Sequence, residues 1–141
     1  LVAQFTANVT SALTVQQLTS DIRGPEDLPG KRVVTVESST SAMYLTDHNI
    51  RFLSVPNIDE AYAMLANDKV DAIVYDAPVL RYYSGTDGKG SANVIGSVFK
   101  PEKYGIALPA GSPLREPINE ILLEMYQDGT LEEIEDRWFG E

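Results

Sequence analysis

From Lys31 onward the sequence alternates between segments typical of buried strands and segments typical of helices, and this alternation constrains the fold more than any other feature. The strand segments are short runs rich in Val, Ile and aromatic residues. They cover residues 32–36, 51–55, 71–75, 93–99 and 104–108. Helical patterns lie between them, starting in the cluster 38–41, covering 58–69 and running from Pro78 to Gly85. Repeated strand–helix–strand units predict an α/β fold with a mostly parallel sheet flanked by helices.

The last part of the chain predicts a pair of helices. Gly129 closes the first of them, and the capping-box pattern over residues 130–133 starts the second. Their apolar faces consist of Leu114, Ile118, Ile121, Leu122 and Met125 in the first helix and Leu131, Ile134 and Trp138 in the second. Exposed patches of this size drive association, so we expect these faces to be covered by a partner.

The first eighteen residues follow a different pattern from the rest. Val2, Phe5, Val9, Leu13 and Gln16 fall near one face of a helix, with Thr, Asn and Ser between them. This spacing predicts an amphipathic helix, although several of these residues are mediocre helix formers. The following residues, 21–30, contain two Gly and Pro clusters and are typical of a linker.

Charge and composition exclude several classes of function. A net charge of −10 repels nucleic-acid backbones and anionic membrane surfaces, so we expect no nucleic-acid partner. The chain has no cysteine and one histidine, which excludes disulfides and zinc clusters, and no cofactor is expected. The sequence contains neither an apolar run of about 18 residues nor a leader at its start, so if the protein is exported we expect the segment that exports it to lie outside this sequence.

Two loops follow neighbouring predicted strands and carry candidate ligand-binding groups. In open α/β sheets, ligands bind beyond the carboxyl ends of the strands. Ser38, Ser39 and Thr40 combine hydroxyl groups with the start of a helix, an arrangement that suits a carboxylate. Asp76 ends a hydrophobic strand, where it could bind an ammonium group. Each of these residues could instead serve as a helix cap, which leaves both interpretations open.

Considered together, the two loops complement the two charged ends of an amino acid. An enzyme on the same fold, such as a cyclic-acid dehydratase, would need a general acid or base in the cleft, and Asp76 is the one candidate. No Gly-x-Ser-x-Gly elbow or glycine-rich phosphate loop occurs in the sequence. We therefore expect a binding protein and not an enzyme.

The segment Phe5–Val15 resembles the end of the third membrane helix of ionotropic glutamate receptors. That signature reads Tyr-Thr-Ala-Asn-Leu-Ala-Ala-Phe-Leu-Thr-Val, and its Thr-Ala-Asn and Leu-Thr-Val blocks recur here at the same spacing. An Ile-x-x-x-Glu-Asp-Leu linker at Ile22 to Leu28 then leads into the second half of a ligand-binding domain. That half is similar to bacterial solute-binding proteins for polar amino acids, which have the type II periplasmic-binding-protein fold.

The resemblance implies roles for the residues that match the family motifs. Ser39 and Thr40 fall on the pair that binds the ligand's carboxylate, and Asp76 falls on the acidic residue that holds its α-ammonium. Ser38 stands where the family often has glycine. Residues 104–109 match the Tyr-Gly-Ile-Ala crossover to the first lobe, and residues 131–140 match the closing helix. The family's carboxylate-binding arginine belongs to the first lobe, which this chain lacks.

The resemblance also implies a domain organisation and a function. Residues 1–20 would be the remnant of a pore-lining helix, 21–30 a linker, 31–103 the second ligand-binding lobe, and 104–141 the crossover strand and helices that pack on the first lobe. The intact protein would be a ligand-gated cation channel of the cell membrane, with potassium as the expected ion and this domain on the extracytoplasmic side. It would be a tetramer. For this fragment alone, the apolar faces of the last two helices predict that it dimerises or aggregates. The alternative is the periplasmic amino-acid-binding component of an ABC transporter.

Overall fold

The structure, a computed structural model of the 141-residue chain, describes residues 2–4, 9–16 and 21–139. The chain divides into two units. The larger unit is formed by residues 10–100, and the smaller one combines residues 1–9 with residues 101–141. Each unit has its own sheet and helices, and each is described by itself.

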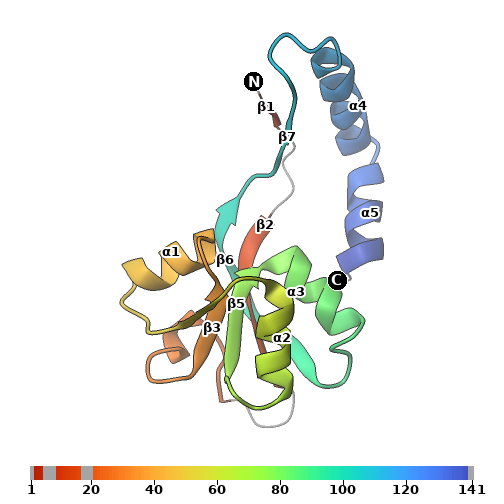
Figure 1. Cartoon of the computed structure of the whole chain (residues 1–141). Helices are drawn as coiled ribbons and strands as arrows, with labels where there is room; N and C mark the ends of the chain where they lie inside the picture. The colour runs from red at the N-terminus through yellow and green to blue at the C-terminus, as the bar shows by residue number, and fades with distance from the viewer. Residues whose placement is uncertain (1, 5–8, 17–20, 140–141) are drawn as a thin grey trace. The chain divides into compact units, whose positions relative to one another are not determined.

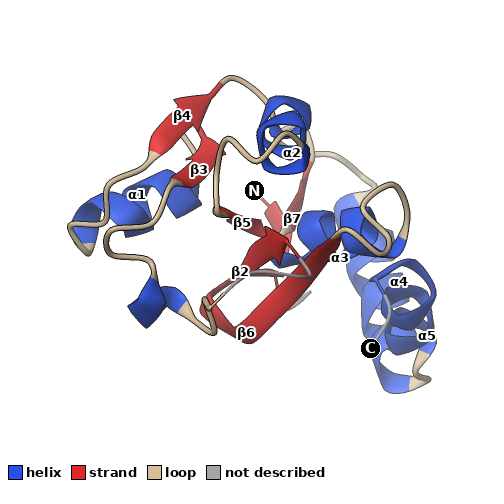
Figure 2. Cartoon of the chain, turned by 90° about the horizontal axis from the view of Figure 1, so that it is seen from below, coloured by secondary structure: helices blue, strands red, loops and turns tan. Residues whose placement is uncertain are grey.

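The larger unit is built on a five-stranded sheet with the strand order β4-β3-β5-β2-β6 (Figures 1 and 2). Strand β3 (Val33–Val36) lies parallel to β4 (Leu53–Val55) on one side and to β5 (Ala72–Asp76) on the other. Strand β2 (Val9–Gln16) is antiparallel to β5, and β6 (Ala92–Glu102) lies at the edge. The predicted α/β class and the strands predicted after Lys31 are therefore confirmed.

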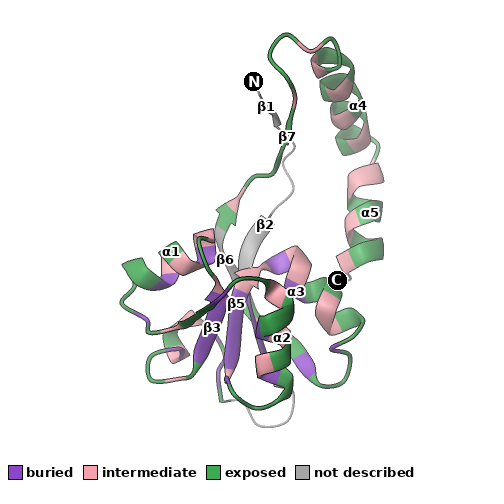
Figure 3. Cartoon of the chain, in the orientation of Figure 1, coloured by how far each residue is buried: buried purple, intermediate pink, exposed green. Residues whose placement is uncertain are grey.

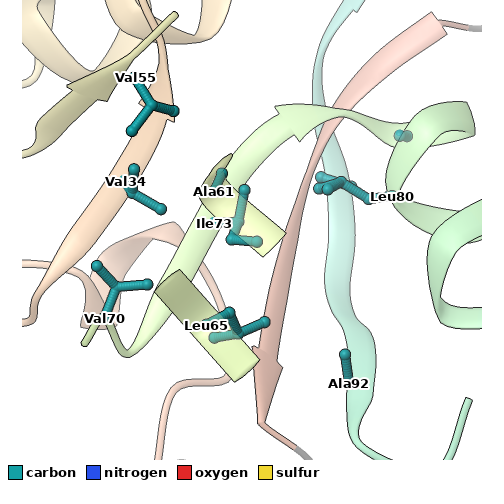
Figure 4. Close-up of a cluster of buried hydrophobic side chains, with 10 residues drawn as sticks. Val34, Val55, Ala61, Leu65, Val70, Ile73, Leu80 and Ala92 are labelled. Carbon is teal, nitrogen blue, oxygen red and sulfur yellow. The ribbon is translucent and has the colours of Figure 1, made fainter. Parts of the chain in front are cut away.

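Helices cover both faces of this sheet. Helix α1 (Thr40–Asp47) lies on one face, and helices α2 (Ile58–Ala66) and α3 (Ala77–Gly85) lie on the other (Figure 2). Alternate strand residues point to opposite faces, so the sheet divides the core into two clusters. The cluster under α2 and α3 includes Val34, Val55, Ala61, Leu65, Val70, Ile73, Leu80 and Ala92 (Figure 4). The cluster under α1 includes Leu13, Val15, Ile22, Leu28, Val33, Leu45 and Val74.

The helix predicted for the first eighteen residues is wrong in this structure, because the described part of that segment forms strands. Strand β2 lies inside the sheet, between β5 and β6, with Leu13 paired to Val74 and Thr14 paired to Ile73. Its residues from Ala12 to Val15 are all buried, whichever face they point to. A strand that is buried on both faces lacks the alternation of polar and apolar residues that marks a half-buried strand. The sequence pattern therefore did not identify β2 as a strand.

The segment predicted as a linker contributes to the core of the larger unit. It contains the single-turn helix η1 (Pro25–Asp27) between two buried side chains, Ile22 and Leu28, which are 4% and 0% exposed. Both side chains belong to the cluster under α1. Residues 22–28 therefore form part of the body of this unit.

An ion-pair cluster holds together the amino ends of β3 and β5. The Arg32 guanidinium donates to Asp71 Oδ1 from Nη2 at 2.6 Å and from Nε at 3.1 Å, and the Arg32 backbone amide donates to Asp71 Oδ2 at 2.7 Å. Arg32 Nη1 also donates to the Asp68 carbonyl oxygen at 2.7 Å. Hydrogen bonds from Arg32 hold the pKa of the Asp71 carboxyl below its ordinary value.

The smaller unit combines two short strands with the predicted helical pair. Strand β1 (Val2–Gln4) is antiparallel to β7 (Gly105–Ala107), and helices α4 (Arg115–Gln127) and α5 (Thr130–Phe139) follow. Gly129, with a φ of 85°, makes the left-handed turn between the helices, as predicted. None of the residues that the structure describes in α4 and α5 is buried (Figure 3). The exposed apolar side chains in and beside these helices are Leu114, Ile121, Leu123, Tyr126, Ile134 and Trp138.

Candidate ligand-binding site

The two predicted binding loops lie at the same edge of the larger unit's sheet. Ser38, Ser39 and Thr40 follow β3, and Asp76 is the last residue of β5. Because β3 and β5 are adjacent and parallel, their carboxyl ends lie side by side (Figure 1). This is the edge at which α/β sheets place ligands.

Ser38 has an unusual backbone conformation. Its φ of 57° lies in the left-handed region, where a side chain costs roughly 1 kcal/mol relative to glycine. The strained residue turns the chain from the end of β3 into the start of α1, and its side chain is exposed. The conformation explains why glycine would fit this position well.

Ser39 is the N-cap of α1. Its Oγ accepts a hydrogen bond from the Ala42 amide at 3.0 Å and donates to the Val36 carbonyl oxygen at 2.7 Å. The proton of this hydroxyl group is therefore directed at the backbone, and the cap interpretation describes what Ser39 does in this conformation.

Thr40 is the first residue of α1 and its side chain is half-buried, while Ser41 behind it is fully buried. The positive end of the helix dipole lies at this point, and it favours a negatively charged group. Of the three predicted hydroxyl residues, Thr40 therefore occupies the position best suited to an anionic part of a ligand.

Asp76 occupies the N-cap position of α3, yet its side chain makes no capping hydrogen bond. Pro78 stands in the first turn of that helix, where its missing amide proton costs nothing. The Asp76 carboxylate is half-buried. Burial first, and then the charge of Asp76, raise the pKa of the neighbouring Tyr75 hydroxyl. For Asp76, unlike Ser39, the structure gives no support to the cap interpretation.

The structure adds a residue that the sequence analysis missed. Thr35 in β3 is fully buried, and its hydroxyl group donates to the Val74 carbonyl oxygen in β5 at 2.6 Å. Its Oγ1 also lies 3.4 Å from Ser39 Oγ. The available signal was a polar residue inside the run Val33 to Val36, because a buried hydroxyl group needs a partner.

His48 does not join the site. It is the C-cap of α1, where its ring nitrogen Nδ1 lies 2.8 Å from the Tyr44 carbonyl oxygen and its ring lies 4.0 Å from the Tyr44 ring. Over the described parts of the chain, no group of three acidic or histidine side chains could hold a metal ion. Nor is any described helix long and apolar enough to cross a membrane.

Comparison with known proteins identifies the family of the chain. The profile of the family described as bacterial extracellular solute-binding proteins, family 3, matches residues 28–141. The chain belongs to this family. The match covers the whole carboxyl-end site of the family 3 domain, including Ser38 to Thr40 and Asp76.

Curated relatives include eukaryotic receptors. The family 3 domain is 30% identical over 155 residues to the human ionotropic glutamate receptor subunit NMDA 2D, an alignment that covers 98% of this chain and 12% of the receptor. It is 27% identical to the rat subunit NMDA 3A over 96% of this chain and 13% of that receptor. The chain thus spans about an eighth of the length of the receptors that it matches.

Solved structures have the same fold. The ligand-binding core of GluR0 from Nostoc punctiforme, in complex with L-glutamate, has a TM-score of 0.76 and 45% sequence identity. The likeness covers 94% of this chain and 62% of that core. An ancestral arginine-binding protein bound to glutamine has a TM-score of 0.76 and 32% identity, over 99% of this chain and 64% of the other. The fold is therefore that of a glutamate-receptor-like, type II solute-binding domain.

Proposed function

We propose that this chain is the second half of an amino-acid-binding domain in a glutamate-receptor-like channel. The observation that carries the proposal is the position of Asp76, a half-buried acidic residue that ends β5 at the sheet edge where α1 starts. A carboxylate and a helix start at one edge complement the ammonium and carboxylate groups of an amino acid. The GluR0 core in complex with L-glutamate, at 45% identity, supports this ligand class.

The channel interpretation rests on the segment Phe5–Val15. Its Thr-Ala-Asn and Leu-Thr-Val blocks resemble the end of a receptor pore helix, which a transporter's binding component has no reason to contain. Similarity to NMDA 2D over 98% of the chain supports the same interpretation. We therefore propose a tetrameric cation channel, with potassium as the ion and this domain on the extracytoplasmic side. The transporter component remains the second candidate, because ancestral arginine-binding proteins are also similar.

The proposed site is completed by a first lobe. This chain corresponds to 62% of the GluR0 core, so more than a third of such a core lies outside it. The exposed apolar side chains of α4 and α5 are the surface that a first lobe would cover. Cleft closure opens the channel only if the ligand binds the closed cleft more tightly than the open one.

The same apolar surface predicts the behaviour of the isolated fragment. Without a first lobe, α4 and α5 would associate with those of a second copy, so light scattering should report a dimer. Replacement of Ile121 and Tyr126 by Lys should shift the fragment to a monomer, because both side chains are more than half exposed on α4. A monomer at all concentrations before any substitution would contradict this expectation.

Calorimetric titration of the domain with both lobes tests the proposed ligand. L-glutamate, L-glutamine and L-arginine would be titrated into the unchanged domain and into an Asp76→Asn variant. Loss of the charge-assisted hydrogen bond should weaken binding of the preferred amino acid by about 2 kcal/mol, roughly 30-fold.

Asp47→Asn is the matched control, because it removes the same charge from the far, exposed end of α1. It should leave the affinity unchanged. Equal binding by the Asp76 variant and the unchanged domain would make Asp76 a structural residue, and an absence of binding by the unchanged domain would reopen the ligand class.

A further inference from the structure

The two strands that lead into the site are held together differently at their two ends. At the amino ends, Arg32 binds Asp71 through three hydrogen bonds. The parallel ladder between β3 and β5 then pairs Val33 with Ala72 and Val34 with Ile73, and goes no further. On its other side, β3 stays paired with β4 as far as Val36.

The Thr35 hydroxyl group connects β3 to β5 beyond the end of this ladder. It donates to the Val74 carbonyl oxygen at 2.6 Å, a short and therefore strong bond, from a side chain that is 0% exposed. Val74 lies two residues before Asp76, and Thr35 lies four residues before Ser39. The bond thus joins the strands at their last buried level before the two binding loops.

The directions of the protons place Thr35 beneath Ser39. Both carbonyl oxygens can only accept, so Thr35 gives its one hydroxyl proton to Val74 and Ser39 gives its proton to Val36. The two hydroxyl oxygens, 3.4 Å apart, are then in packing contact. Since Ser39 Oγ caps α1 through the Ala42 amide, the position of Thr35 also sets the position of the first turn of α1.

We propose that Thr35 is a positioning residue for the ligand site. It does not contact the ligand. By bonding β5 and supporting Ser39 it fixes the separation between the α1 start, which receives the carboxylate, and Asp76, which receives the ammonium group. This inference rests on the proposed amino-acid-binding function. It identifies Thr35 as the residue that holds the two parts of the site, the α1 start and Asp76, at a fixed separation.

Thr14 provides a matched control within the same sheet. It is also a threonine with 0% exposure in a strand next to β5, but its Oγ1 makes no hydrogen bond in the described structure. Thr→Val replaces the hydroxyl group by a methyl group of similar size at either position. The two substitutions therefore differ in whether they remove a bond between the strands.

The first experiment measures binding of L-glutamate, L-glutamine and L-arginine to the full-length protein and its variants. Thr35→Val should weaken binding of the preferred amino acid roughly tenfold, whereas Thr14→Val should leave the affinity unchanged. Thr35→Ser retains the hydroxyl group and should recover most of the affinity. Unchanged affinity in Thr35→Val, or equal losses in the Val and Ser variants, would overturn the proposal.

The second experiment needs no ligand, so it separates this inference from the proposed function. Hydrogen–deuterium exchange of residues 38–44 reports the cap on the Ala42 amide. In the ligand-free protein, Thr35→Val should speed exchange of this segment roughly tenfold, while Thr14→Val and Thr35→Ser should not. If the unchanged protein binds none of the three amino acids, the proposed function fails, and this exchange rate still decides whether Thr35 positions the loop. An unchanged exchange rate of residues 38–44 in Thr35→Val would refute the positioning role of Thr35.

Discussion

Thr14→Val should stabilise the protein. The Thr14 side chain is fully buried in β2, on the sheet face that packs against α2 and α3, and its hydroxyl oxygen has no hydrogen-bond partner in the described structure. Its paired residue in β5 is Ile73, and the neighbouring Ala12 points to the same apolar cluster. An unpaired hydroxyl group among apolar side chains loses its hydration on folding and gains nothing in return.

The size of the effect follows from this environment. An unsatisfied buried hydroxyl group costs roughly 1–3 kcal/mol, and the methyl group that replaces it contributes about 0.8 kcal/mol of apolar burial. Valine has nearly the shape of threonine and the same preference for strands, so neither a cavity nor a clash offsets the gain. We therefore expect the free energy of unfolding of Thr14→Val to exceed that of the unchanged protein by about 1–2 kcal/mol.

Urea denaturation followed by far-ultraviolet circular dichroism measures this change. The chain's one tryptophan, Trp138, lies in α5 and outside the unit that contains the sheet, so its fluorescence is a poor probe of Thr14. The same substitution at Thr35 should lower stability by roughly 1 kcal/mol, because there it removes a 2.6 Å hydrogen bond. A neutral or destabilised Thr14→Val variant would refute the reasoning, since it would mean that the hydroxyl group has a partner such as a buried water molecule.

Three further changes test the local structure. Ser38→Gly should raise the free energy of unfolding by up to about 1 kcal/mol, because glycine adopts a φ of 57° without the strain of a side chain. The control Ser84→Gly in α3 should lower the free energy of unfolding by roughly 0.5 kcal/mol, because glycine is a poor helix former. Thermal denaturation measures both changes. Ser39→Ala removes the α1 cap and should cost about 1 kcal/mol in urea denaturation, with Ser39→Asp retaining most of the stability. Asp71→Asn should destabilise at neutral pH but not in strong acid. Hydrogen bonds from Arg32 lower the folded-state pKa of Asp71 below 3.8. The ionised Asp71 carboxylate therefore stabilises the fold above pH 3.8, and this stabilisation is lost as the pH falls through the lowered pKa. If Asp71→Asn were still destabilising at low pH, this explanation would be contradicted.

Elements with a clear period were predictable from the sequence. Helix α2 was evident from Ile58, Ala61 and Leu65 at helical spacing, and β5 from an unbroken apolar run that ends in Asp76. The N-terminal segment was not, because Ala12 to Val15 are buried on both faces of the sheet and so lack the alternation that marks a strand. The neighbours that bury them come from β5 and β6, far along the chain.

The site was predictable in its residues but not in their roles. Ser39 and Asp76 both stand immediately before helices, and the sequence offers the same two interpretations, cap or ligand group, for each. The difference lies in hydrogen bonds: Ser39 Oγ bonds Val36 and Ala42, whereas the Asp76 carboxylate caps nothing. Thr35 escaped notice for a related reason, because its partner Val74 is 39 residues away in the sequence.

The position of β2 between β5 and β6 has a consequence for how this domain folds. Strands β3, β4 and β5 can pair within a stretch of about 45 residues, but β6 joins them only through β2, whose partner Val74 lies some 60 residues from Leu13. During synthesis β2 leaves the ribosome before β5 has been made, so β2 stays unpaired with β5 until the later strand is complete. Until β2 pairs with it, β5 is the unpaired edge of the sheet formed by β4, β3 and β5, and an unpaired edge is open to wrong strand pairing.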